Sequence, residues 1–453
     1  MTVSAESTGH GRYRDRILQV EPYGVERVDA SERHGTPFQL FTLWLGANLS
    51  IADFALGFLP VHLGLSWPMI LGSIIIGNIL GGVLLALAAV MGPTFGLPQL
   101  MIGRMSFGRI GGYLPALLNW ISTVGWFTVN NILGVFGLQI LFPRLSFIVG
   151  SIILILVQGF LAIYGHNLIH SFERIMAVVL GILFLIASFL TGSQIAAVSY
   201  AGTTPHPLAM AVIVAGAAFS YIASWAPYAS DYSRYLPEHT SMAKGFVWAF
   251  LGSVAASLWL EILGAVTAGI AGPHGGNAIH ALANVTGRWA IPMVIAIILG
   301  GVAANALNLY SNALSAGALD LRMSRTGLTV VAMVVGLFLS LAGAGRFESF
   351  YENFLLLLGY WVTPWIAILI VDFFIFRHRS VVRIEKGTVP NSVGSGVGAF
   401  LLGILVSIPF MSSTLYTGPV AKLLNGADLS FYVGFLAAGI LYFIFRRNSM
   451  ARA

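Results

Sequence analysis

The sequence is poor in charge and contains no cysteine. Only 9% of its 453 residues are charged, whereas 57% are hydrophobic; soluble globular proteins carry about 25% charged residues. So few charges cannot cover a water-facing surface, and the chain is therefore expected to be an integral membrane protein with several spans. The absence of cysteine excludes disulfides, thiol catalysis and cysteine-based metal sites.

Long stretches of the chain have no Lys, Arg, Asp or Glu, and these stretches divide into membrane spans. A transmembrane helix needs about 20 mainly apolar residues. Cutting the uncharged stretches at Gly, Pro and polar residues predicts twelve transmembrane helices. They are expected at 38–62, 67–91, 111–142, 145–164, 174–192, 207–229, 246–271, 290–315, 327–344, 351–375, 395–412 and 429–446.

The basic residues are distributed unevenly over this layout. With a cytoplasmic N-terminus, nineteen Lys and Arg residues fall on the cytoplasmic side and four on the other. Cytoplasmic segments of membrane proteins carry such an excess. We therefore predict a multi-pass protein of the plasma (inner) membrane with both termini in the cytoplasm. The net charge of +6 follows from this placement and does not indicate nucleic-acid binding.

Two of the predicted spans are interrupted near their middle. In the sixth span Pro227 follows Trp225, and proline removes a backbone donor from a helix. In the first span small and polar residues gather between Gly46 and Asp53. Backbone groups freed inside a membrane must find partners in protein, water or ligand. Spans one and six are five apart, so two five-span halves would cross in opposite directions, and paired interruptions of this kind mark transporter binding sites.

The expected fold is all-α, with ten helices in a 5+5 inverted repeat and two extra helices. The predicted regions are a cytoplasmic N-terminal tail at 1–37, a transport core at 38–376, a cytoplasmic loop at 377–394, helices 11 and 12 at 395–446, and a cytoplasmic tail at 447–453.

Short motifs follow one another along the first two thirds of the chain. They include Tyr23-Gly24-Val25-Glu26, Gly46-Ala47-Asn48, Arg104-Met105-Ser106-Phe107-Gly108, Gly125-Trp126-Phe127, Ser230-Asp231-Tyr232-Ser233-Arg234-Tyr235-Leu236-Pro237 and Asn308-Leu309-Tyr310-Ser311. In this order they resemble nucleobase–cation symporter family 1, on its purine–cytosine permease branch. The resemblance implies a leucine-transporter-type fold and cation-coupled uptake of a small planar ring, with no cofactor and no enzyme activity. The oligomeric state stays open, a monomer included.

Two residues of the third span suit a flat heterocyclic substrate. Trp126 and Asn130 are four residues apart and share a helix face. Tryptophan offers stacking area for the ring face, and asparagine both donates and accepts at the ring edge. The resemblance places a stacking Trp and an amide at these positions. It also assigns the substrate to Trp225, Asn305, Asn308, Ser50 and the backbone around Ser224.

Each of these residues also has an ordinary structural interpretation. A Trp can fill a kink, a buried Asn can join two helices, and a Ser can bond to its own helix.

The coupling ion is H+ or Na+. The resemblance places the carbonyls of a sodium site on Gly46 and Leu49. The hydroxyl positions of that site fall on Leu299 and Gly300, so the sodium pattern is incomplete, and no metal site is certain.

Two carboxylates lie well inside predicted spans, Asp53 and Glu261. Such residues are costly in a membrane and usually functional. Either could exchange a proton, and Asp53 is favoured because it follows the interruption in the first span. The alternative is a carboxylate that pairs with a polar neighbour or lines a watery vestibule.

The main functional prediction is import of a nucleobase, cytosine or a purine, with a proton favoured over sodium. The same fold would suit another ring, such as a hydantoin, allantoin, or a thiamine- or pyridoxine-like vitamin. A channel should show a charged or carbonyl-lined filter, and a membrane enzyme a nucleophile–base or metal cluster; neither is visible in the sequence.

Four charged residues are expected at the cytoplasmic face, Asp231, Arg234, Arg104 and Arg109. They could form ion pairs that close a gate, or lie in solvated loops.

Overall fold

The computed structural model describes residues 24–164, 166–194, 202–272, 277–321, 325–377 and 393–451. In these residues the regular structure is helical, apart from an isolated bridge between Ser412 and Thr417. The motif residue Tyr23, most of the predicted tail at 1–37 and most of the predicted loop at 377–394 lie outside the described residues.

The main helices follow the predicted segments closely. They are α1 (Phe38–Asn48), α2 (Ile51–Leu56), α3 (Leu59–His62), α4 (Trp67–Ala89), α5 (Met91–Phe95), α6 (Gln99–Phe107), α7 (Tyr113–Leu141), α8 (Phe147–Tyr164), α9 (His166–Gly192), α10 (Pro207–Ala223), α11 (Ala229–Ser233), α12 (Met242–Ala271), α13 (Ala278–Thr286), α14 (Ala290–Gly317), α15 (Arg325–Gly343), α16 (Phe347–Val371), α17 (Gly394–Ser407), α18 (Pro419–Leu423) and α19 (Ser430–Ala451). The largest difference is α9, which begins at His166 where the prediction began at residue 174.

Hydropathy identifies a membrane protein with eight or nine candidate spans among the described residues. Among the described residues eight helices are long and apolar enough to cross a membrane, and α1 with α2–α3 forms a ninth candidate that is bent by 57°. Shorter apolar helices cover 147–162, 178–192 and 394–410. The all-helical membrane fold is confirmed, whereas the twelve crossings and the inverted repeat stay predictions.

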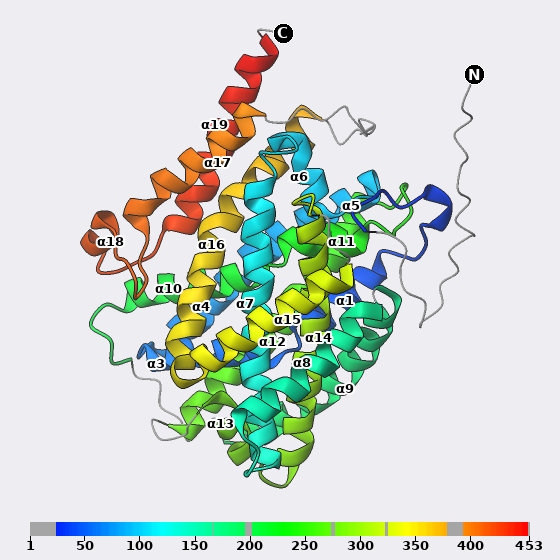
Figure 1. Cartoon of the computed structure of the whole chain (residues 1–453). Helices are drawn as coiled ribbons and strands as arrows, with labels where there is room; N and C mark the ends of the chain where they lie inside the picture. Colours follow the sequence, from blue (N-terminus) through cyan, green and yellow to red (C-terminus); the bar gives the residue numbers. More distant parts are fainter. Residues whose placement is uncertain are drawn as a thin grey trace.

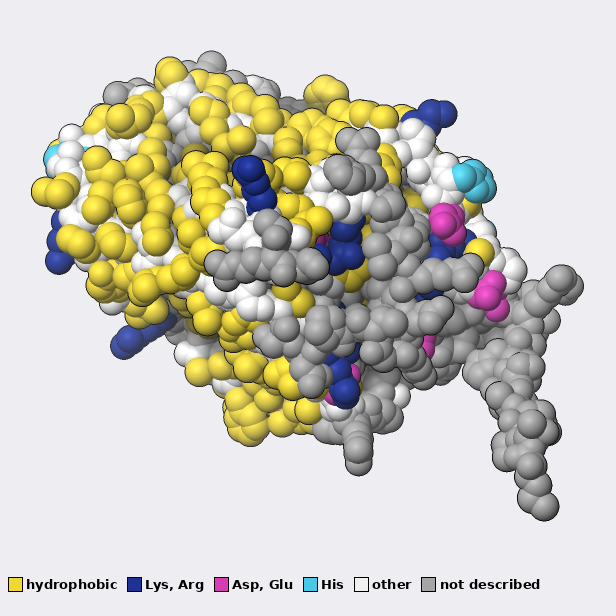
Figure 2. Space-filling model, turned by 90° about the horizontal axis from the view of Figure 1, so that it is seen from above, with side chains coloured by type: hydrophobic (Ala, Val, Ile, Leu, Met, Phe, Trp, Pro, Cys, Tyr) yellow, Lys and Arg dark blue, Asp and Glu magenta, His cyan; other side chains and the backbone are white. Residues whose placement is uncertain are grey.

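The outer surface of the helices is apolar. Hydrophobic side chains cover the flanks in the view from above, and basic side chains are visible at that end (Figure 2). Exposed hydrophobic residues are spread over α4, α7, α8, α9, α15, α17 and α19. A continuous apolar surface of this kind suits lipid rather than water. In Figure 1, α5, α6, α11 and the end of α19 lie toward the upper end, and α3 and α13 toward the lower end.

The first predicted interruption is a short extended segment between α1 and α2. Leu49 leaves helical geometry with a ψ of 62°, and Ser50 is extended with φ −124° and ψ 157°. Ser50 then starts α2, because its hydroxyl oxygen accepts the backbone N–H of Asp53 at 3.3 Å.

The second interruption follows α10, which ends at Ala223. A single 3-10 turn at Ala226–Tyr228 contains Pro227, and α11 continues the chain. Proline cannot donate the backbone bond that a continuous helix would need at this point. Both interruptions lie where the sequence predicts them.

Two glycines let α2 approach α12 closely. A Cβ added to Gly57 would lie 2.0 Å from the backbone oxygen of Glu261, and one added to Gly264 would lie 2.0 Å from that of Phe54. Small residues permit such contacts between membrane helices. The crossing places the segment that carries Asp53 against the middle of α12, which carries Glu261.

Candidate functional site

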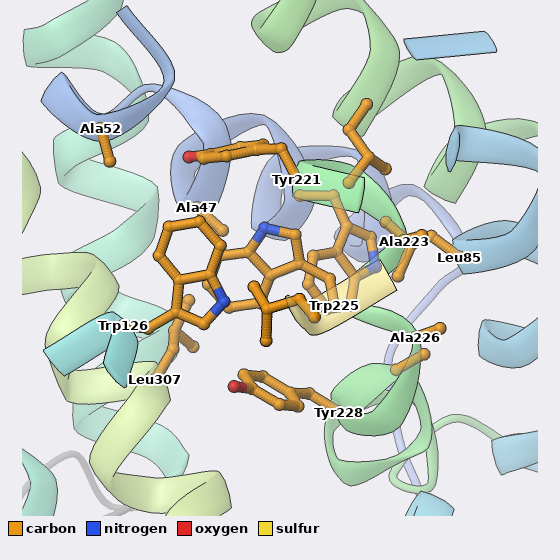
Figure 3. Packing of buried hydrophobic residues seen from close by; sticks show 14 of the residues in the cluster. Ala47, Ala52, Leu85, Trp126, Tyr221, Ala223, Trp225, Ala226, Tyr228 and Leu307 are labelled. Carbon is orange, nitrogen blue, oxygen red and sulfur yellow. The ribbon is translucent and has the colours of Figure 1, made fainter. Parts of the chain in front are cut away.

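Trp126 from α7 and Trp225 from the second interruption belong to one buried cluster (Figure 3). The Trp126 ring meets the edges of three aromatic rings. Its centroid lies 5.2 Å from Tyr221, 5.1 Å from Phe354 and 6.2 Å from Tyr351. Edge-to-face contacts of this kind fix the orientation of a ring, so Trp126 is held as a rigid apolar plate.

Trp225 is fixed by a hydrogen bond as well as by packing. Its ring lies 5.7 Å from Trp44 and 5.3 Å from Tyr228. Its indole N–H donates to Oδ1 of Asn48 at 3.1 Å. Because Asn48 is the last residue of α1, this bond joins the two interruptions. Sequence reasoning assigned Asn48 to a motif but not to this contact.

Three asparagines and a glutamine form a buried amide cluster next to the aromatic cluster. Asn130 and Asn308 both donate through Nδ2 to Oδ1 of Asn305, at 3.0 and 3.1 Å. Asn305 in turn donates to the Phe127 carbonyl and to Oε1 of Gln158, at 3.0 and 3.1 Å. Sequence reasoning missed Gln158, because one glutamine in an apolar helix carries no recognisable motif.

Two oxygens of this amide cluster lack a donor within the described part of the chain. They are Oδ1 of Asn130 and Oδ1 of Asn308, and both residues are buried. A buried acceptor without a donor is costly, by about 1–3 kcal/mol. The pair can therefore receive N–H groups from a ligand.

Ser50 and Ser224 both contact Tyr221. The Ser224 hydroxyl donates to the Tyr221 carbonyl at 2.7 Å, within its own helix turn. The hydroxyls of Ser50 and Tyr221 lie 2.9 Å apart. Ser224 thus makes the ordinary helix contact, whereas Ser50 links the first interruption to the helix that precedes the second.

Asp53 and Glu261 are fully buried and their side chains adjoin one another. Asn78 donates to Oε2 of Glu261 at 2.8 Å, and Ser257 lies beside Asp53. Ser257 and Glu261 are the side chains that act on the Asp53 carboxyl group as hydrogen-bonding neighbours. Two carboxyl groups in contact are stable only if a proton or another cation relieves their repulsion.

The positions that would supply the hydroxyls of a sodium site, Leu299 and Gly300, carry no hydroxyl. The Gly46 carbonyl accepts the N–H of Leu49 at 3.2 Å. A Cβ added to Gly300 would lie 3.1 Å from both the Leu49 carbonyl oxygen and a methyl carbon of Leu180. Hard cations need several oxygen ligands. The groups that face the Leu49 carbonyl here are Gly300, which has no side chain, and a methyl group of Leu180. Leu299 and Gly300 therefore offer a cation no side-chain oxygen.

At the end of the molecule where α6 lies (Figure 1), Asp320 binds three side chains, those of Arg104 on α6, Arg109 in the link to α7 and Tyr113 at the start of α7. Its carboxylate accepts from Arg104 at 2.9 Å, from Arg109 at 2.7 Å and from the Tyr113 hydroxyl at 2.5 Å. Partial burial by itself would raise the pKa of Asp320, but the hydrogen bonds from Tyr113, Arg109 and Arg104 outweigh it and lower the pKa to about 2. We call these four residues the Asp320 clamp.

The four charged residues that the sequence places at the cytoplasmic face, Arg104, Arg109, Asp231 and Arg234, all have partners in the structure. The two arginines bind Asp320, which sequence reasoning missed. Arg234 is fully buried and donates to the carbonyls of Gly24 and Glu26, so it does not lie in a solvated loop. Asp231 accepts the backbone N–H of Gln99 at 3.0 Å.

At the opposite end the molecule is hollowed. A cavity of about 320 Å³ is lined by residues of α2, α3, α13 and α16, among them Tyr351, and by Phe58 and Asn277, which precede α3 and α13. The Tyr351 hydroxyl donates to the Ala52 carbonyl at 2.9 Å, and its ring also meets Trp126. Tyr351 therefore separates this cavity from the aromatic cluster.

Two interrupted apolar helices around a buried aromatic and amide cluster, closed at one end and hollowed at the other, are typical of a membrane transporter. Comparison with known proteins agrees. The profile of the family described as "Permease for cytosine/purines, uracil, thiamine, allantoin" matches residues 27–434. The chain belongs to this family.

Individual relatives match over nearly the whole length. The putative purine-cytosine permease YxlA of Bacillus subtilis is 31% identical, over 96% of this chain and 98% of that protein. The purine-cytosine permease fcyB of Emericella nidulans is 27% identical, over 95% and 89%. The resemblance inferred from the motifs is confirmed, and so is the expectation of a permease rather than an enzyme.

A solved structure shows the same fold. It is that of Mhp1, a nucleobase-cation-symport-1 family transporter in a closed conformation with bromovinylhydantoin bound. It superposes with a TM-score of 0.78, at 20% identity, over 94% of this chain and 95% of that one.

Proposed function

We propose that this protein imports a nucleobase, cytosine or a purine, by symport with a proton. The observation that carries the substrate class is a pair of amide oxygens, on Asn130 and Asn308, that lack a donor within the described residues, together with the Trp126 ring one helical turn before Asn130 on α7. Nucleobases have flat apolar faces and N–H groups along their edges. Stacking on Trp126 with N–H donation to these oxygens satisfies both surfaces.

The second plate in this proposal is Trp225. It lies in the same buried cluster as Trp126 but belongs to a different element (Figure 3). A ring held between them would contact Asn305 at its edge, with Ser50 and the backbone around Ser224 near the interruptions. The names of the curated relatives, which include purine and cytosine permeases, support this substrate class.

Competition for uptake tests the substrate. Cells that lack their own nucleobase uptake would express the protein, and labelled cytosine or adenine would compete with a panel of rings. We expect inhibition by nucleobases. The panel includes allantoin and thiamine, because the family description names them, together with a hydantoin and pyridoxine. Uptake of one of these with no response to any nucleobase would refute the nucleobase assignment.

The buried carboxyl pair supports a proton as the coupling ion. Asp53 and Glu261 adjoin one another in a fully buried position, and a proton on either carboxyl removes the repulsion between two negative charges. The absence of a hydroxyl at Leu299 and Gly300, which lie where a sodium site would need one, also favours the proton. A proton taken up with the substrate would neutralise one carboxyl group and lower the free-energy cost of burying negative charge inside the membrane.

Uptake with sodium removed, and separately with a protonophore, distinguishes the two ions. We expect only the protonophore to abolish accumulation. Asp53→Asn should lose accumulation against a gradient, while the exposed carboxylate variant Asp29→Asn should keep it. An Asp53→Asn protein that still concentrates the substrate would contradict the role of this residue.

We further propose twelve spans with a 5+5 inverted repeat, cytoplasmic termini and a plasma-membrane location. Because the chain has no cysteine, a single introduced cysteine reports its own side of the membrane. Leu415→Cys, at a position that is 74% exposed, should react with an impermeant maleimide on intact cells. Ser449→Cys near the end of α19 should react only after permeabilisation, and the reverse pattern would invert the topology.

A further inference from the structure

Two buried tyrosines connect the start of α2 with the Trp126 ring. The Tyr221 hydroxyl lies 2.9 Å from Oγ of Ser50, and the Tyr351 hydroxyl donates to the Ala52 carbonyl at 2.9 Å. Both tyrosine rings stand edge-on against Trp126, at centroid distances of 5.2 and 6.2 Å. We call Tyr221 and Tyr351 the tyrosine bridge.

The turn that the tyrosine bridge contacts also holds Asp53. Ser50 begins α2 by accepting the backbone N–H of Asp53. A negative charge in the first turn of a helix is favoured by the unpaired N–H groups there. A proton on Asp53 removes that charge, so it changes how firmly the first turn of α2 is held.

The surroundings of Asp53 make a bound proton the natural way to change its charge. The titratable groups that act on it are Glu261 from α12, Tyr221 from α10 and Tyr351 from α16, and Ser257 also faces it. None of these groups is a cation. Tyr221 and Tyr351 thus contact both the first turn of α2, which carries Asp53, and the ring of Trp126.

We propose that the tyrosine bridge transmits proton binding at Asp53 and Glu261 to Trp126, so that the affinity for the ring depends on the proton. Tyr221 and Tyr351 act as positioning residues: their hydroxyls hold the first turn of α2, and their rings set the position of Trp126. This inference rests on the proposed function. It names the contacts through which substrate and proton would be coupled, and sequence reasoning assigned neither tyrosine.

Replacing each tyrosine by phenylalanine tests the inference, because Tyr221→Phe and Tyr351→Phe keep the ring and remove only the hydroxyl. In the unaltered protein, linkage requires the affinity for labelled cytosine to rise as the pH falls through the titration of the carboxyl pair. Coupling between two sites typically amounts to about 5- to 150-fold in affinity. In the phenylalanine variants the change between about pH 5.5 and about pH 8 should shrink to about twofold, and fewer protons should enter per substrate.

Controls separate this effect from a general loss of packing. Tyr432→Phe changes a half-buried tyrosine of α19 that packs on Phe219 at 5.6 Å, and it should leave the pH dependence intact. If a bridge variant fails to fold, Ser50→Ala removes the other partner of the Tyr221 hydroxyl and should flatten the pH dependence in the same way.

The outcomes distinguish the two proposals. A flattened pH dependence in either phenylalanine variant, with normal thermal stability, supports the tyrosine bridge. Full pH dependence in both overturns the bridge and leaves proton symport standing. If the unaltered protein shows neither pH-dependent affinity nor proton entry with substrate, both proposals fail.

Discussion

Replacing Trp126 is the sharpest test of the aromatic plate. The residue is buried among the edges of Tyr221, Tyr351 and Phe354, so its loss has two effects that must be separated. Trp126→Ala removes the stacking surface and opens a cavity. Trp126→Phe keeps an aromatic face of smaller area and disturbs the packing less.

The expected loss of substrate affinity follows from stacking energies. Stacking of one base on one aromatic side chain contributes about 1–3 kcal/mol, and about 1.4 kcal/mol corresponds to tenfold in affinity. Trp126→Ala should therefore weaken binding of the ring about 5- to 150-fold, and Trp126→Phe should fall between this and the unaltered protein. Truncating a buried tryptophan also costs about 3–5 kcal/mol of stability, so the alanine variant should unfold at a lower temperature.

Equilibrium binding of labelled cytosine or hypoxanthine to the purified protein measures the affinity, and thermal unfolding in the same detergent measures the stability. Trp365→Phe is the matched control. Trp365 is fully buried on α16, and its indole N–H has no hydrogen-bond partner within the described residues, so the change breaks no bond of that group. The reasoning is refuted if Trp126→Ala remains folded and binds every ring of the panel within about twofold of the unaltered protein.

Three further predictions concern the amide cluster, the Asp320 clamp and the crossing of α2 with α12. Asn305→Leu removes the acceptor shared by two amides; it should reduce uptake about tenfold or more and broaden ring selectivity, because about 1–3 kcal/mol is lost when buried donors are left unpaired. In a protein with a single introduced cysteine at the site, Ser224→Cys, the Asp320→Asn change should raise the reactivity of that cysteine toward maleimide added from the Asp320 side, since it weakens the clamp. The pKa of Asp320 is lowered to about 2. The ionised carboxylate therefore stabilises the folded protein at any pH above its ordinary pKa, and this stabilisation is lost only as the pH falls toward about 2. Because Asp320 does not titrate between about pH 5 and about pH 8, the Asp320→Asn variant should keep the pH dependence of transport in that range. Gly57→Ala would bring a methyl group against the backbone of Glu261 and should lower the unfolding temperature, at a cost of about 1–3 kcal/mol, whereas Gly72→Ala in α4 meets open space and should not.

Much of the architecture is readable from local sequence. Long uncharged stretches place the helices, since a membrane helix requires apolar length. Pro227 and the small and polar residues around Gly46 locate the two interruptions, because each changes the backbone hydrogen bonding of its own turn. Ordered motifs identify the family, and the spacing of Trp126 and Asn130 places both on one helix face.

Contacts between distant segments required the tertiary structure. The sequence marks Asp53 and Glu261 as separate intramembrane carboxylates, but only the close crossing at Gly57 and Gly264 brings them together. Asp320 escaped notice because it is a lone carboxylate in the short turn after α14, with no motif around it, and only folding carries Arg104 to it.

The same distinction applies to the candidate site itself. Hydropathy and backbone chemistry act within one or two helical turns, so the chain alone determines where helices run and where they break. Partner choice depends on how those helices cross and how far each side chain reaches. That is why the hydroxyl contact of Tyr221 with Ser50 and the amide contact of Gln158 with Asn305 were decided only by the packed structure.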